Sequence, residues 1–135
     1  MRRITPRQGA RLLAAGRAAL GVAVLAAPEQ VAGRWLGESN AALPVVGDLA
    51  RSLGARDLAL GIATLQTLED PVIGPRVQLV CALVDSVDVL ATVIARASLP
   101  RKGLFGTVAI AGAAAGAGFY LAITQAARSG GSGSR

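Results

Sequence analysis

Residues 77–97 read VQLVCALVDSVDVLATVIARA, an apolar run about as long as a helix needs to cross a bilayer. Its few polar side chains recur at three- and four-residue spacing, which places them on one face of a helix. A charge at bilayer depth costs roughly 2.5 to 3.5 kcal/mol, so this face is expected to point toward protein or water. The polar face consists of Gln78, Cys81, Asp85, Asp88 and Thr92.

The composition of the chain favours lipid as its surroundings. Hydrophobic residues make up 53% of the 135 residues and charged residues 16%, against about 25% charged in soluble domains. The mean hydropathy is +0.52. The apolar content excludes a disordered chain, and the lone Cys81 excludes a disulfide scaffold. With no histidine in the chain, a His/Cys metal site and a nucleophilic triad with a histidine base are also excluded.

Three further apolar runs, 9–27, 46–68 and 104–127, have a similar length. Proline disfavours helix in the residue before it, so Pro28, Pro71 and Pro100 mark the ends of runs. The sequence therefore predicts an all-α protein, a four-helix transmembrane bundle with short loops, as one domain over residues 1–128. A flexible Gly/Ser tail is expected at 129–135.

The longest connection, from Glu29 to Pro44, follows the first span. Its Val31, Trp35 and Leu36 share one helical face, and tryptophan is suited to the headgroup level. We expect an interfacial helix here. The first run also has features of a secretory signal, with a basic start and small residues before Pro28. Arg17 interrupts its apolar core, which favours a retained helix.

The net charge of +6 lies mostly at the ends of the apolar runs, as expected of cations that meet anionic lipid. No basic cluster has an aromatic platform beside it, which excludes nucleic acid as a partner. The positive-inside rule favours a multi-pass protein of a bacterial cytoplasmic membrane with both termini in the cytoplasm. One side would carry Arg2, Arg3, Arg7, Arg11, Arg76 and Arg128, and the other Arg34, Arg96, Arg101 and Lys102.

Five ionisable residues lie within the runs rather than at their ends. Counting the rise per residue from the span ends puts the acids and arginines at similar depths. We therefore expect a buried network in which two arginines neutralise most of three aspartates, and the surplus acid binds a proton or a cation. The residues are Arg17, Arg56, Asp57, Asp85 and Asp88.

Small residues at helical spacing predict close packing of helices. Gly54 and Gly61 share a face of the second run with Asp57, and Gly112 and Gly116 stand four residues apart in the fourth run. These four glycines are predicted packing positions.

Three functions fit this pattern, and a non-enzymatic structural or interaction subunit without a cofactor is the first. It would associate as a homo-oligomer or with a larger membrane complex. The second is conduction or co-transport of a proton or small cation along Asp57, Asp85 and Asp88. The third reads Asp85 and Asp88 as a magnesium pair in a lipid-diphosphate enzyme, for which a single D-x-x-D is a weak signal.

Part of the sequence resembles a known group of proteins. Trp35-Leu36-Gly37 after Pro28, the G-x-R-D-x-x-x-G stretch from Gly54 to Gly61, and an aspartate in the third span are similar to small actinobacterial four-helix membrane proteins classed as a domain of unknown function. The likeness extends over about residues 10–127. It implies an integral-membrane bundle with Gly54, Arg56, Asp57 and Gly61 as signature residues, and it assigns no activity.

Overall fold

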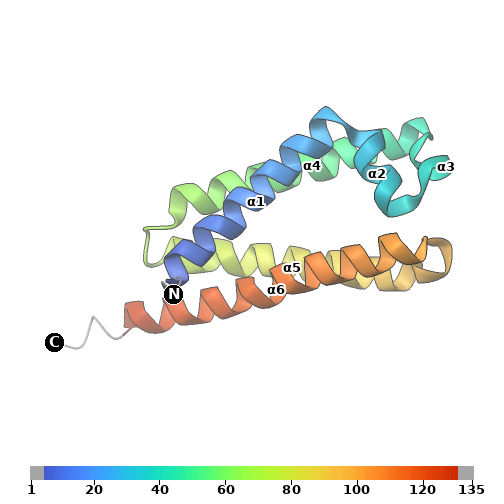
Figure 1. Ribbon diagram of the computed structural model, residues 1–135. Coiled ribbons are helices and arrows are strands. Elements are labelled where there is room, and N and C mark those ends of the chain that lie inside the picture. Colours follow the sequence, from blue (N-terminus) through green and yellow to red (C-terminus); the bar gives the residue numbers. More distant parts are fainter. Residues whose placement is uncertain (1–4, 131–135) are drawn as a thin grey trace.

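The computed structural model describes residues 5–130, which form helices and short connections without a strand among them (Figure 1). The prediction of an all-α protein is confirmed. The prediction of four helices is wrong, because six α-helices and one 3₁₀-helix are present in the described residues. In chain order they are α1 (Pro6–Ala26), α2 (Pro28–Leu36), α3 (Glu38–Ala41), α4 (Pro44–Thr67), α5 (Ile73–Ile94), η1 (Ala95–Ser98) and α6 (Arg101–Gly130).

The four long helices form two layers. α1 packs along α4, and α5 packs along α6, whereas contact between the two layers is less extensive (Figure 1). α1 begins and α6 ends at the same end of the molecule, and α2 and α3 cover the opposite end (Figure 1). Successive long helices therefore run in opposite directions, as short connections require.

The two additional helices lie in the connection for which one interfacial helix was predicted. Pro28 stands at the first position of α2, where its missing N–H and fixed φ are tolerated, so the chain restarts a helix directly after α1. Gly37 ends α2 with a φ of +87°, a value that L side chains rarely adopt. The connection is thus divided into α2 and α3 at a glycine.

Close packing within the first layer depends on glycines. A Cβ added at Gly21 would lie 2.5 Å from the backbone nitrogen of Leu58, and one added at Gly61 would lie 2.8 Å from the carbonyl oxygen of Ala14. Gly54 likewise faces the carbonyl oxygen of Gly21. Small residues at these positions let the two backbones approach directly.

The glycines of α6 behave differently from the prediction. A Cβ at Gly112 or Gly116 would meet no atom within 4 Å, so neither packs against another helix among the described residues. Gly118 instead lies against Ala82 of α5. The four-residue spacing placed Gly112 and Gly116 on one side of the helix correctly, but that side faces away from the neighbouring helices.

The predicted Gly/Ser tail does not begin at residue 129, because α6 continues through Ser129 to Gly130. The rest of that predicted tail, residues 131–135, lies outside the described part of the chain. The basic residues Arg2 and Arg3 used for orientation also lie outside it.

Several polar side chains are buried while many large apolar side chains are exposed, an unusual distribution for a soluble protein. Among the buried residues are Thr64, Gln78, Asp85 and Thr92. The outer face of α5 alone exposes Leu79, Val80, Leu83, Val87, Leu90 and Ile94. A core of small residues inside and large aliphatic residues outside suits a body surrounded by hydrocarbon.

Three helices are long and apolar enough to cross a membrane: α1, α5 with its η1 extension to Ser98, and α6 as far as Ala127. α4 is not among them by composition, because Asp48, Arg51, Arg56 and Asp57 lower its hydropathy. Its 24 residues nevertheless fall within the range of 21 to 27 residues that those helices contain, and its two central charges are engaged inside the bundle.

Candidate functional site

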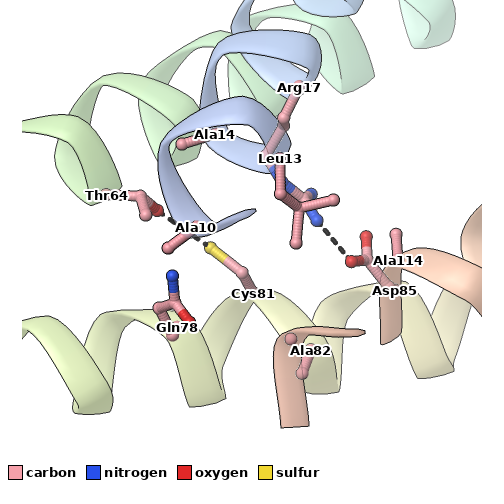
Figure 2. Close-up of a pocket in the computed structure, with 11 residues that line it drawn as sticks. Ala10, Leu13, Ala14, Arg17, Thr64, Gln78, Cys81, Ala82, Asp85 and Ala114 are labelled. Carbon is pink, nitrogen blue, oxygen red and sulfur yellow. Dashed lines mark hydrogen bonds and ion pairs between the residues drawn. The ribbon is translucent and has the colours of Figure 1, made fainter. Parts of the chain in front are cut away.

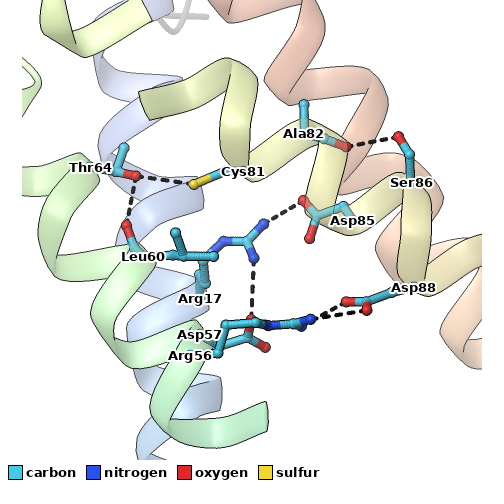
Figure 3. Close-up of polar contacts among 10 residues, drawn as sticks. All are labelled: Arg17, Arg56, Asp57, Leu60, Thr64, Cys81, Ala82, Asp85, Ser86 and Asp88. Carbon is cyan, nitrogen blue, oxygen red and sulfur yellow. Dashed lines mark hydrogen bonds and ion pairs between the residues drawn. The ribbon is translucent and has the colours of Figure 1, made fainter. Parts of the chain in front are cut away.

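The structure brings the five predicted ionisable residues into one connected chain of ion pairs (Figure 3). Arg17 comes from α1, one arginine and one aspartate come from α4, and two aspartates come from α5. Acidic and basic side chains alternate along this series of ion pairs. Its order is Asp85, Arg17, Asp57, Arg56 and Asp88, and we call these five residues the charge network.

Arg17 makes the first link between the two layers. Its Nη2 donates to Asp85 Oδ2 of α5, and its Nη1 donates to Asp57 Oδ1 of α4 at 3.3 Å. The side chains of Arg17 and Asp85 are only 8% and 7% exposed. A guanidinium ion this deeply buried is tolerated because its planar donors reach two carboxylates at once.

Arg56 makes the second link between the layers. Its Nη1 and Nη2 donate to Asp88 Oδ1 and Oδ2 at 3.1 and 2.8 Å, a bidentate geometry that holds both groups in one orientation. Nη2 and Nε also donate to Asp57 Oδ1 at 3.1 and 3.3 Å. Arg56 and Asp88 are about a third exposed, at 32% and 30%, so this end of the network lies nearer the surface.

Helical spacing explains why these side chains meet. Asp85 and Asp88 are three residues apart on α5, so both point at the other layer. Arg56 leaves the backbone of α4 in a direction about 100° around the helix axis from the small-residue face. Its long side chain nevertheless reaches both its neighbour Asp57 and Asp88 across the layer contact. The two ion pairs that join the layers, Arg17–Asp85 and Arg56–Asp88, therefore both have their aspartate on α5.

A second polar group lies one to two turns before Asp85 on α5 (Figure 2). Thr64 Oγ1 donates to the carbonyl oxygen of Leu60 at 2.8 Å and lies 3.5 Å from Cys81 Sγ. Since the hydroxyl has only one proton, the thiol is the donor in the second contact. Gln78 is 3% exposed, and its Oε1 has no hydrogen-bond partner among the described residues.

A small cavity separates the layers at this point (Figure 2). The empty space amounts to about 280 Å³ including its open mouth, and its interior has room for about one water molecule. All four long helices contribute to its wall. Its polar side is lined by Arg17, Thr64, Gln78, Cys81 and Asp85, and its α6 side by Ala114 and Gly118.

The geometry does not favour a magnesium pair. Asp85 and Asp88 each accept from an arginine, so neither carboxylate is free to share a divalent cation without losing its guanidinium partner. Within residues 5–130 no group of three or more acidic or thiol side chains is arranged to hold a metal ion.

Some features of the site needed the structure. The helical spacing of Thr64 places it on the small-residue face of α4 with Gly54 and Gly61, but those glycines pack on α1, so spacing did not show the contact of Thr64 with Cys81 of α5. The unpaired oxygen of Gln78 could not be found from spacing, because it depends on which side chains fill the cavity. The exposed pairs of Arg7 and Arg11 with Glu69 also needed the structure, since Glu69 belongs to a turn.

Comparison with known proteins gives no independent assignment. A scan against family models, a search of curated proteins and a search of solved structures each found no match to this chain.

Proposed function

We propose that this chain is a small non-enzymatic membrane protein, a structural or interaction subunit of a bacterial cytoplasmic membrane. One observation carries this function: charged side chains are buried between the two layers, while large aliphatic side chains cover the outside. Lipid is the surrounding that makes both placements favourable at once. The resemblance to actinobacterial four-helix membrane proteins supports the membrane placement and leaves the role open.

In this proposal all four long helices cross the membrane, including α4. Arg56 and Asp57 cost little there because both are engaged in the charge network, and Asp48 and Arg51 lie near the end of the helix. Four crossings place α1's start and α6's end on one side, which is the cytoplasmic side by the positive-inside rule. The short α2 and α3 would then lie at the outer surface.

The role of the charge network in this proposal is to fix the two layers to each other. Contact between the layers is less extensive than contact within each layer, so packing alone defines their relative position poorly. Buried ionic groups can specify one arrangement where apolar packing does not. With the two layers fixed in this way, the bundle would present one defined surface to a second copy of the chain or to a larger complex.

Cysteine labelling of intact cells tests the number of crossings. Cys81 is replaced by serine, and single cysteines are introduced by Ser39→Cys, Glu69→Cys or Ser98→Cys. Four crossings predict that a membrane-impermeant maleimide labels positions 39 and 98 from outside and position 69 only after permeabilisation. Equal labelling of positions 39 and 69 from outside would show that α4 does not cross.

Conduction of a proton or small cation is the second candidate. The polar face of α5 favours it, because Gln78, Asp85 and Thr92 are buried over much of the helix length. Proteoliposomes separate the two functions. A structural role predicts no proton or cation flux above that of empty vesicles, and flux that disappears in a stable Asp85→Asn protein would establish conduction instead.

A further inference from the structure

The end of the molecule formed by α2, η1 and the start of α6 carries cations without an acidic partner (Figure 1). Arg34 of α2 and Arg101 and Lys102 of α6 are exposed, and none of them forms an ion pair within residues 5–130. At the other end, by contrast, two arginines near the start of α1 both pair with Glu69. The positive charge at the α2 and α6 end is therefore available to a ligand.

These three cations belong to helices that touch each other. The start of α6 lies directly on the end of α2, since a Cβ added at Gly103 would overlap the carbonyl oxygen of Trp35. Arg34 and Lys102 are the chain neighbours of the two residues in this contact. The cations therefore flank one junction, and we call Arg34, Arg101 and Lys102 the outer cationic surface.

Acids at the same end do not neutralise this surface. α2, α3, η1 and the first turn of α6 contain four cations, of which Arg96 is the fourth, and two acids, Glu29 and Glu38. Neither acid forms an ion pair within the described part of the chain, and Asp48 and Arg51 of α4 pair with each other. With four crossings this end faces outward, where the positive-inside rule predicts few cations.

Large apolar side chains are exposed next to the outer cationic surface. Phe105 is 70% exposed and follows Arg101 by four residues, so it lies on the same face of α6, about 6 Å farther along the helix axis. Ile94, which is 71% exposed, ends α5 at this end of the molecule. A soluble polyanion would leave these apolar side chains uncovered. A ligand that fits both features has a negative headgroup with hydrocarbon beyond it, as an anionic phospholipid does.

We propose that the outer cationic surface binds the headgroup of an anionic phospholipid, with the phosphodiester against the three cations and an acyl chain along Phe105. Arginine and lysine bind phosphate oxygens through charge-assisted hydrogen bonds. The lipid supplies the negative charge that this end of the bundle lacks, and it lies over the junction of α2 with α6. This inference rests on the membrane placement in the proposed function, but not on the role of the charge network.

Native mass spectrometry of the protein in detergent tests the lipid site. The protein is incubated with phosphatidylglycerol and phosphatidylcholine of the same acyl chains, and the lipids retained on the folded chain are compared. We expect the parent protein to retain phosphatidylglycerol preferentially. Combining Arg101→Gln with Lys102→Gln is expected to weaken this preference by about tenfold or more, because each cation near an anionic lipid typically contributes a factor of about five.

Combining Arg7→Gln with Arg11→Gln is the matched control, since it removes the same charge from arginines that Glu69 already engages. We expect this variant to keep most of the preference for phosphatidylglycerol. An equal loss in the two double variants would show that binding follows net charge alone and would overturn the site. Absence of any preference in the parent protein would overturn it as well.

Competition with glycerol phosphate, which has the phosphate without acyl chains, separates a lipid from a soluble phosphate compound. We expect it to leave phosphatidylglycerol bound when both are present at equal concentration, and we expect Phe105→Ala to reduce retention of that lipid. Displacement by glycerol phosphate would overturn the lipid assignment. Failure here is distinct from failure of the membrane placement, which cysteine labelling at positions 39 and 69 measures without added lipid.

Discussion

Arg17 is the residue that engages both layers most deeply. It pairs with Asp57 in its own layer and with Asp85 in the other, and its side chain is almost fully buried. Removing one partner of a buried ion pair leaves an uncompensated charge, which typically costs about 3–5 kcal/mol.

We predict that Arg17→Gln lowers the free energy of unfolding by about 3 kcal/mol, measured by denaturant titration in mixed micelles. The matched control is Arg51→Gln in α4, whose pair with Asp48 is exposed and expected to contribute about 0–1 kcal/mol. Equal stability of the two variants would show that the network does not hold the layers together.

Asp70 contributes a pH-dependent term outside the long helices. Its Oδ1 accepts from the backbone N–H groups of Ile73 and Val72 at the start of α5, and these hydrogen bonds lower the pKa of the carboxyl group. A lowered pKa in the folded state means that the ionised carboxylate stabilises the fold above its unfolded pKa of about 3.9. That contribution is lost as the pH falls from there through the lowered folded pKa.

We predict that Asp70→Ala lowers the Tm at neutral pH, and that the Tm difference from the parent protein shrinks as the pH falls below about 4. Asp70→Asn is the control, because asparagine retains the capping oxygen without titrating there. A Tm difference for Asp70→Ala that stays constant down to the lowest pH would contradict the capping role.

At the scale of the element, the contact between α1 and α4 is set by backbone approach rather than by large side chains. A methyl group at Gly61 would meet the backbone and Cβ of Ala18 at 2.8 Å, so the helices would have to separate. We predict that Gly61→Ala costs about 1–3 kcal/mol of stability, as overpacking does. Thermal unfolding in detergent measures it.

Gly112→Ala is the control for this prediction, since a Cβ there meets nothing within 4 Å and alanine is the better helix former. We expect it to unfold at the same temperature as the parent protein or slightly above it. If Gly61→Ala proved as well tolerated as Gly112→Ala, the close approach of α1 and α4 would be wrong.

The helical class and the polar face of α5 could be predicted from the sequence, because both follow from residue type and a 3.6-residue period. The division of the first connection into α2 and α3 could not, since it depends on the conformation of Gly37. Nor could the outward direction of Gly112 and Gly116. Spacing shows that two residues share a face of a helix, but not which face meets a neighbour.

At the scale of the whole molecule, the five members of the charge network could be selected from the sequence because charges within apolar runs are rare. Their pairing needed the structure. Asp57 is shared by two arginines while Asp85 contacts one, and this inequality arises from how the two layers approach each other.

The central claim is that the outer face of α5 contacts lipid while its polar face meets the other layer. Spin labels at successive α5 positions, introduced by Leu79→Cys, Leu83→Cys and Leu90→Cys on the outside and Gln78→Cys and Thr92→Cys on the inside in a Cys81→Ser background, measure this in vesicles. Power-saturation EPR compares collisions with oxygen, which partitions into lipid, against a water-soluble nickel chelate. We predict that the outer labels collide with oxygen and not with nickel, and that the inner labels collide weakly with both. Outer labels that collide mainly with the nickel chelate would contradict the account.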